Sequence, residues 1–240
     1  MNVKTIHMAE ETEQFSVKVN DQESITALLY PAAKKIRAGL TALLGHGAGA
    51  NQLSGFMRTF AQGLAERGLD VMTFNFVYME QGRSVPVQKS KLESCFRAVI
   101  ETIAKHRRLK SNRLVVGGKS MGGRIASQVV AARADEPLAL DVSGLVFLGY
   151  PLHPPGNPAK LRVEHLGQIQ KPMLFVQGTR DALGTPEEIQ PFVKDLKPPV
   201  EIFAIQGGDH SFKAPKTLAV SQENVFEAAM NEIVRWAEKI

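Results

Sequence analysis

The chain has 240 residues, a formal net charge of +5 and a hydrophobic content of 44%, which are typical of an ordinary globular α/β domain. A single cysteine excludes an intramolecular disulfide, and no segment reaches the roughly 18 consecutive apolar residues of a membrane span. The first five residues lack the apolar core of a signal peptide, so we expect one cytoplasmic domain over residues 1–240 with no metal, no cofactor and no membrane partner.

The predicted elements alternate between apolar strands and amphipathic helices. In chain order we expect strands at 15–19, 24–30 and 40–44, a helix at 53–67, a strand at 71–76, a helix at 90–108, a strand at 113–117, a helix that ends at about 133, strands at 145–148 and 172–176, a helix at 186–196, a strand at 200–205 and a helix at 222–239. The first two strands form an antiparallel pair. The alternation predicts an α/β fold with a doubly wound, mostly parallel sheet, whose functional groups lie at the carboxyl ends of its strands.

The helix expected at 90–108 has the clearest apolar periodicity. Its apolar residues follow the spacing of a helix with one buried face, and they are Leu92, Cys95, Phe96, Val99, Ile100 and Ile103. Cys95 lies on that face, so we expect a core thiol rather than a reactive one. The basic run 105–110 follows where the helix ends, where cations complement the helix dipole, and no aromatic residues interleave with it. We therefore expect no nucleic-acid partner.

The most informative motif lies between the strand at 113–117 and the helix that follows it. Residues 118–122 have the sequence Gly-Lys-Ser-Met-Gly and match the G-x-S-x-G nucleophile elbow. The elbow is a sharp strand-to-helix turn that exposes a strained serine, so the positions two residues away must be small. The motif predicts Ser120 as a nucleophile. An ordinary glycine-rich turn is the alternative, and the context decides between the two.

A serine hydroxyl needs a base within hydrogen-bond reach and an acid that orients the base. In this architecture the chain order is serine, acid, histidine. His210 lies in a glycine-rich loop after the strand at 200–205, and Asp181 follows the strand at 172–176. Both are therefore expected at the carboxyl ends of strands. We predict that His210 is the base and Asp181 the acid.

Other residues of these types fit the two roles less well. His7 and His46 precede the serine, and His106 lies in the basic run. His153 and His165 follow the serine but precede the best acid. Asp209 is adjacent to His210, too close in sequence to orient it from behind. Asp195 lies near the end of a predicted helix. Asp181 thus remains the preferred acid.

A tetrahedral intermediate also needs two preorganised backbone N–H groups for its oxyanion. One is expected from Met121, which follows the nucleophile at a helix N-terminus. The other is expected from the glycine-rich turn after the strand at 40–44, from Ala48 or alternatively from Gly49. In the same turn, His46 is expected to have a structural rather than a catalytic role.

Rival motifs fail on their spacing. A phosphate-binding P-loop needs a glycine where Arg113 stands. A dinucleotide fingerprint begins after the first parallel strand, but Ala50 occupies the place of its third glycine; because alanine is tolerated there, this site stays open as a minor alternative. Clusters of histidine, cysteine and carboxylate at metal-ligand spacing are absent from the sequence.

Together these motifs resemble those of the α/β-hydrolase superfamily. The matching motifs, in family order, are the HGAG turn at 46–49, the GKSMG elbow at 118–122, the GTRD turn at 178–181 and the GGDH turn at 207–210. Through the segments 45–50, 149–155 and 161–166, the chain is most similar to the small, capless group related to dienelactone hydrolases, which includes the Tex30/KANL3-like hydrolases. Dienelactone hydrolases use a cysteine nucleophile, whereas a serine stands here at 120. The resemblance implies an α/β-hydrolase fold with little or no cap.

The segment from 151 to 171 is too short for a large helical cap. We expect an open, shallow cleft, with His153 in the roof and Tyr78 in a wall as the residues that contact the substrate. Lys119 is unusual beside a nucleophile. It either favours acidic substrates or forms a salt bridge that points outward, and we prefer the latter.

These features predict a serine hydrolase that cleaves small acyl esters or thioesters through a Ser120–Asp181–His210 triad and an acyl-enzyme. A serine peptidase of the prolyl-oligopeptidase type is one alternative, although the chain has no room for the propeller domain of that group. A non-enzymatic interaction module on a hydrolase scaffold is another. The expected partner is a small acyl substrate, and the expected oligomeric state is a monomer or homodimer.

Overall fold

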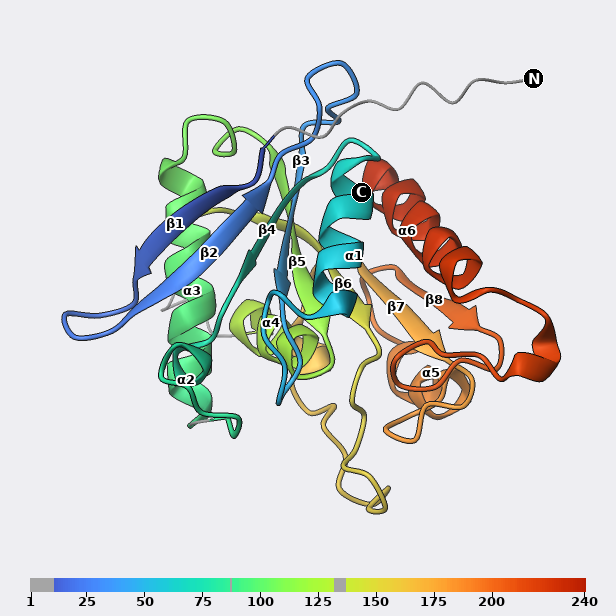
Figure 1. Ribbon diagram of the computed structural model, residues 1–240. Helices are drawn as coiled ribbons and strands as arrows, with labels where there is room; N and C mark the ends of the chain where they lie inside the picture. Colours follow the sequence, from blue (N-terminus) through green and yellow to red (C-terminus); the bar gives the residue numbers. More distant parts are fainter. Residues whose placement is uncertain (1–10, 87, 132–136) are drawn as a thin grey trace, which may run out of the picture.

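The computed structural model describes residues 11–86, 88–131 and 137–240, and within them eight strands form one sheet in the order β1-β2-β4-β3-β5-β6-β7-β8 (Figure 1). The strands are β1 (Glu13–Lys18), β2 (Ser24–Tyr30), β3 (Leu40–Gly45), β4 (Asp70–Phe74), β5 (Arg113–Lys119), β6 (Val142–Leu148), β7 (Met173–Gly178) and β8 (Val200–Ile205). The pairs β1–β2 and β2–β4 are antiparallel, and every other pair is parallel. The predicted α/β fold with a mostly parallel sheet is confirmed.

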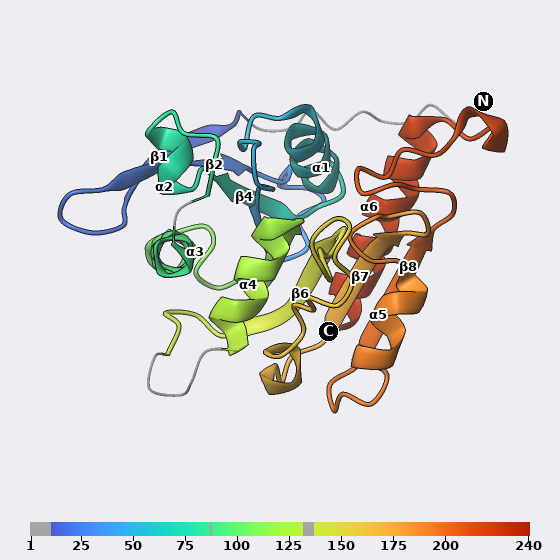
Figure 2. The same ribbon diagram turned by 90° about the horizontal axis from the view of Figure 1, so that it is seen from below.

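Helices cover both faces of the sheet (Figure 2). The helices are α1 (Gly55–Ala65), α2 (Val77–Glu80), α3 (Lys89–Lys105), α4 (Met121–Ala131), α5 (Pro186–Val193) and α6 (Gln222–Lys239), with short 3-10 turns η1 (Leu166–Gln168) and η2 (Lys216–Leu218). Buried residues of α1 and α6 form one apolar core with the sheet, and those of α3, α4 and α5 form a second core on the other face. Because both faces are covered, the central strands β3 and β4 are buried at every position, which explains their mostly apolar sequence.

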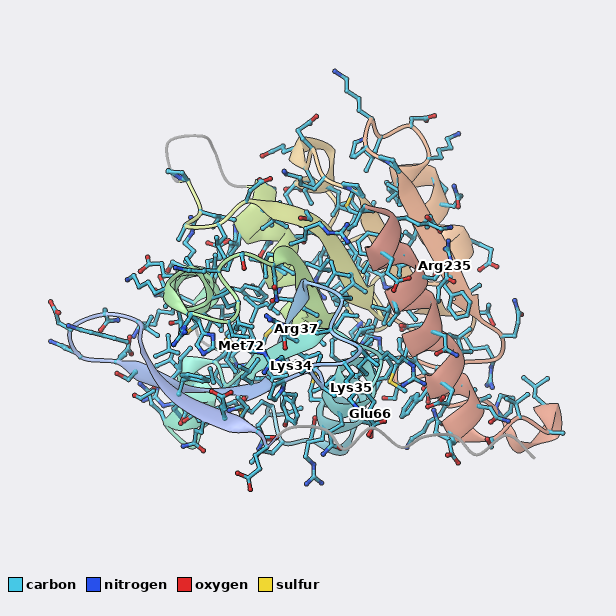
Figure 3. The ribbon with its side chains drawn as sticks, turned by 90° about the horizontal axis from the view of Figure 1, so that it is seen from above. Lys34, Lys35, Arg37, Glu66, Met72 and Arg235 are labelled. Atoms are coloured by element: carbon cyan, nitrogen blue, oxygen red, sulfur yellow. The ribbon has the colours of Figure 1, made fainter. Side chains whose placement is uncertain are left out.

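The amino ends of the parallel strands are fixed by one buried carboxylate. Asp70, at the start of β4, is fully buried and accepts hydrogen bonds from the guanidinium groups of Arg37 at 2.7 Å and Arg108 at 3.0 Å. Arg37 is labelled in Figure 3. Asn112 also donates to Asp70, at 3.0 Å. Because these charge-assisted bonds satisfy the buried carboxylate, Asp70 has a structural role. The candidate functional residues lie at the opposite, carboxyl end of the parallel strands.

At that opposite end, three glycines bring strand ends and a helix into backbone contact. A Cβ atom on Gly118 or on Gly122 would lie 2.1 Å from the carbonyl oxygen of Gly45, which no side chain tolerates. Gly118 also has a φ of +140°, a conformation that favours glycine. The carboxyl ends of β3 and β5 and the start of α4 are therefore pressed together here.

Several element boundaries differ from the sequence-based expectations. The short helix α2 was not expected; its residues Val77 and Tyr78 turn inward after β4 and are buried. Helix α3 ends at Lys105 because His106 adopts an extended conformation. Helix α5 ends at Val193, before the expected 196. The predicted end of the helix near 133 lies outside the described residues.

The segment between β6 and β7 holds only the 3-10 turn η1, so no helical cap covers the described part of the molecule, as expected. No helix within the described ranges is both long and apolar enough to cross a membrane.

Candidate active site

Ser120 lies at the turn between β5 and α4, in a left-handed backbone conformation with a φ of +50°. A non-glycine residue in this region carries strain, and such strain is concentrated at functional sites. The backbone N–H of Ser120 donates to the carbonyl oxygen of Leu148, at the end of β6, at 3.1 Å. The turn is thereby held against the neighbouring strand, and the serine side chain lines the cleft above the sheet.

His210 and Asp181 lie within hydrogen-bond distance of this serine, in series. His210 Nε2 is 2.9 Å from Ser120 Oγ, and His210 Nδ1 is 2.7 Å from Asp181 Oδ2. Because a carboxylate only accepts, Nδ1 carries the proton and Nε2 is the acceptor for the serine hydroxyl. The Asp181 side chain is buried, whereas 27% of the His210 side chain is exposed. The structure brings the three residues together in the geometry that activates a serine.

A buried glutamine, Gln177, orients Asp181. Its Nε2 donates to Asp181 Oδ2 at 2.9 Å and to the carbonyl oxygen of Gly184 at 2.6 Å. The other oxygen, Asp181 Oδ1, accepts from the backbone N–H of Leu183 at 2.8 Å. Sequence analysis missed Gln177. The sequence does carry a signal for it: an amide side chain stands at the end of the otherwise apolar strand β7. A buried polar side chain needs hydrogen-bond partners, so a contact with a nearby polar group could have been expected.

The two residues expected to supply the oxyanion donors lie beside Ser120. Ala48 and Met121 both line the cleft with the serine. Among the described residues, neither backbone N–H donates to a backbone carbonyl, so both remain available to a ligand. Gly47 approaches the serine closely: a Cβ on Gly47 would lie 3.7 Å from the Cβ of Ser120. Two free donors at one nucleophile are suited to hold a developing negative charge.

His46 holds this turn from behind and does not contact the cleft. It is fully buried; its Nδ1 donates to the Gly47 carbonyl at 2.8 Å, and the backbone N–H of Phe76 donates to its Nε2 at 3.1 Å. These two bonds fix a neutral ring, since Nε2 must accept. The structural role expected for His46 agrees with these contacts. Burial lowers the pKa of His46 to about 4.

The depressed pKa of His46 predicts a loss of stability in acid. In the unfolded chain the imidazole of His46 takes up a proton near pH 6.5, whereas in the folded protein it stays neutral until about pH 4. Stability is therefore full above pH 6.5 and falls as the pH drops toward 4, by up to about 3 kcal/mol. Urea unfolding at pH 7.0, 5.5 and 4.5 measures this slope. The variant His46→Gln keeps a donor and an acceptor without the titration, so its slope should be shallower; an identical slope in both proteins would refute the assignment.

Lys119 does not point outward, which corrects the expected salt bridge. Only 9% of the residue is exposed, and its Nζ donates to the backbone carbonyl of His210. The ammonium also lies 5.4 Å from the ring centroid of Phe56 and 5.7 Å from that of Phe212. Burial lowers the pKa of Lys119 to about 8, against the opposing effect of Asp181. Lys119 thus ties the elbow to the loop that carries the histidine.

Two pockets meet at the serine. The larger has a volume of about 650 Å³ and is mainly apolar; its lining includes Phe56, Met57, Phe226, Lys119 and His210. The smaller has a volume of about 340 Å³; its lining includes Lys89, Leu92, Arg124, Ile125 and Arg162. Ala48, Ser120 and Leu183 line both. Ser120 therefore stands between a mainly apolar pocket, whose lining also includes Lys119 and Lys213, and a smaller pocket with two arginines and a lysine.

The two predicted substrate contacts, Tyr78 and His153, line neither pocket. Tyr78 is fully buried because α2 turns it inward, and its ring packs against His46 with the centroids 6.0 Å apart. His153 is also buried, and its Nδ1 donates to the carbonyl oxygen of Pro154 at 3.0 Å. The structure corrects both predictions. The basic residues of the smaller pocket were missed, because no local motif marks them.

No group of three metal-ligating side chains occurs within the part of the chain that the structure describes.

Comparisons with known proteins agree with this fold. A family model described as an alpha/beta hydrolase domain matches residues 38–238. Similar solved structures include an alpha-beta serine hydrolase homologue from Coxiella burnetii, with 21% identity, a TM-score of 0.70 and coverage of 93% of this chain and 96% of that chain. A dienelactone hydrolase from Anabaena variabilis has 18% identity and a TM-score of 0.73, over 96% and 97% of the two chains. An esterase from Pyrococcus furiosus has 17% identity and a TM-score of 0.70, over 94% and 91%. At these identities the likeness shows the fold.

Proposed function

The chain belongs to the α/β-hydrolase family, and on this premise we propose that it is a serine hydrolase that cleaves small acyl esters or thioesters through a covalent acyl-enzyme. The observation that carries the proposal is the unbroken hydrogen-bonded series from Ser120 through His210 to Asp181. The two pockets of the uncapped cleft suit substrates with modest groups on both sides of the scissile bond.

In the proposed reaction, Ser120 Oγ attacks the acyl carbon while its proton passes to His210 Nε2. Asp181 keeps the proton of His210 on Nδ1 and stabilises the imidazolium that forms. The N–H groups of Met121 and Ala48 hold the negative oxygen of the tetrahedral intermediate. Collapse of that intermediate breaks the bond to the leaving group, which takes the proton from Nε2. A water molecule then attacks the acyl carbon and gives its proton to His210 Nε2. The second tetrahedral intermediate breaks its bond to Ser120 Oγ, which takes that proton back, so the acid leaves with Ser120 and His210 restored.

The ester class is favoured over the peptide class by the nature of the cleft. Among the described residues, its walls are side chains and short loops, and no strand edge borders the serine to pair with an extended peptide. The esterase from Pyrococcus furiosus shares the fold, which adds support for an ester substrate.

A covalent probe tests the proposal directly. A fluorophosphonate is expected to label the protein at one site, and peptide mass mapping should locate the adduct on Ser120. Prior incubation with a slowly hydrolysed ester should protect that site. An adduct on another residue, or no adduct, would contradict the proposal and favour the interaction-module alternative. A substrate panel of 4-nitrophenyl esters, acyl thioesters and peptide 4-nitroanilides then separates an esterase from a peptidase.

A further inference from the structure

The smaller pocket beside Ser120 carries positive charge that the proposed reaction does not use. Arg124 comes from α4 and Arg162 from the segment between β6 and β7, and both line this pocket with the serine. Lys89, at the start of α3, lies at its border. The rest of its lining is mostly apolar. Three cationic side chains thus line a space of about 340 Å³.

The two guanidinium groups have no carboxylate partner within the described residues. Arg124 Nη1 donates to Gln128 Oε1 at 3.4 Å, and its Nε is buried without any hydrogen-bond partner. Arg162 reaches only the carbonyl oxygen of Pro151, at 3.5 Å. Glu93, a nearby carboxylate, forms an ion pair with Lys89 at 3.2 Å. Burial first, and then the charge of Arg162, lower the pKa of Arg124.

Such an arrangement costs stability unless an anion completes it. Two like charges repel at close range, and a partly desolvated guanidinium with only one long hydrogen bond loses hydration that this bond does not replace. A carboxylate or a phosphate would accept hydrogen bonds from both groups in the planar geometry that arginine favours. The parts of the two guanidinium groups that line the pocket would supply those donors.

The position of His210 decides which half of the substrate enters this pocket. His210 lines the larger, apolar pocket but not the basic one. Its Nε2 must deliver a proton to the leaving group, so the leaving group lies on the side of His210. The acyl chain then extends past Ser120 to the opposite side, toward Arg124.

We propose that the substrate is an ester or thioester whose acyl half carries a terminal anionic group, a carboxylate or phosphate, bound between Arg124 and Arg162, and whose leaving group is apolar. The inference rests on the proposed serine-hydrolase function and adds the chemical class of the substrate. It gives the two arginines a role in specificity, while bond cleavage stays with Ser120.

Matched substrates test this assignment. Mono-4-nitrophenyl adipate carries a terminal carboxylate, and its methyl ester has a similar chain without the charge. Wild-type kcat/KM is expected to favour the anionic ester by about 10- to 100-fold at low ionic strength, and added salt should reduce that preference. In Arg124→Gln the preference should fall about tenfold, while Arg124→Lys should retain part of it because the charge remains. Arg107→Gln, the same change at an exposed residue beyond the far end of α3, should keep the wild-type preference.

Further substrates identify the anion and its place. Replacing the terminal carboxylate by a phosphonate shows which of the two the pocket prefers. A pair of valerate esters, of 4-hydroxybenzoate and of its methyl ester, places the charge in the leaving group instead; a larger preference there would overturn the acyl assignment. Equal hydrolysis of the adipate and its methyl ester, with Ser120 still labelled by fluorophosphonate, would overturn the inference and leave the proposed function intact. Loss of the labelling itself would overturn both.

Discussion

Replacement of Ser120 by alanine is expected to lower kcat for 4-nitrophenyl butyrate by about 10⁶-fold. The reason is geometric: His210 Nε2 has the serine hydroxyl as its partner at 2.9 Å, and without it no group is placed to form the acyl-enzyme. The N–H groups at Ala48 and Met121 would remain, so a residual acceleration of about 10³- to 10⁴-fold over water is expected. Initial rates at saturating ester, corrected for spontaneous hydrolysis, measure the effect.

The fold should survive this change. An alanine at 120 meets the same left-handed backbone, with a φ of +50°, that the serine already adopts. Thermal unfolding of Ser120→Ala should therefore stay close to that of the wild type. Ser94→Ala provides a matched control: Ser94 lies on the exposed side of α3, and its hydroxyl donates to the Ser90 carbonyl at 3.0 Å. Near-normal turnover in Ser120→Ala, with normal turnover in Ser94→Ala, would refute the proposed mechanism.

The serine, the acid and the histidine were predictable because each lies in a short motif with a steric cause. The elbow needs glycine at 118 and 122, since the carbonyl oxygen of Gly45 lies where a Cβ would be. The strand-to-helix context then fixes the turn, and the chain order fixes the acid and the base. Local sequence therefore contained most of the fold and the three candidate residues.

The features that were not predicted depend on how a turn folds back or on contacts between distant segments. Gln177 reaches Asp181 only because the turn after β7 folds back on its own strand. Lys119 turns inward because the His210 loop, far along the chain, offers a carbonyl oxygen. Arg124 and Arg162 line the same pocket although they are 38 positions apart in the sequence. No periodicity or spacing rule reports such pairings.

The error at Tyr78 has a different origin. The residue follows a strand at its carboxyl end, which in this class of fold is where substrate contacts are expected. The four-residue helix α2 is too short to leave a periodic signal, and it turns Tyr78 against His46. Its aromatic ring therefore supports the turn at 46–49 from the core side, whereas the sequence pattern alone suggested a wall of the cleft.

The variant Asp181→Asn is expected to lower kcat by about 10⁴-fold with little change in KM. Asp181 accepts at both oxygens, from Leu183 N–H on one side and from Gln177 and His210 on the other. An asparagine cannot accept at both. If its oxygen faces Leu183, its NH₂ group faces His210, and His210 Nδ1 must then accept. The histidine is left with its proton on Nε2, where it cannot take one from Ser120.

The opposite orientation of the asparagine keeps the acceptor for His210 but removes the acceptor for the backbone N–H of Leu183. Its oxygen would face His210, but its NH₂ group would then oppose the N–H of Leu183, which lines both pockets. Either orientation leaves a buried donor without an acceptor, so Asp181→Asn should also lose stability, by about 1–3 kcal/mol. Nitrogen NMR of the His210 ring in the variant reports which orientation wins, since it separates the two tautomers.

A control variant that removes the same charge separates two effects of Asp181: orientation of the His210 ring and electrostatic stabilisation of its protonated form. Asp209 adjoins the histidine, and its Oδ1 accepts from the backbone N–H groups of Ser211 at 2.7 Å and Lys213 at 2.9 Å. The variant Asp209→Asn removes a negative charge near His210 yet keeps an oxygen for both of these bonds, so its kcat should stay within a few-fold of the wild type. Equal losses in Asp181→Asn and Asp209→Asn would mean that charge alone matters, and that Asp181 does not orient the ring.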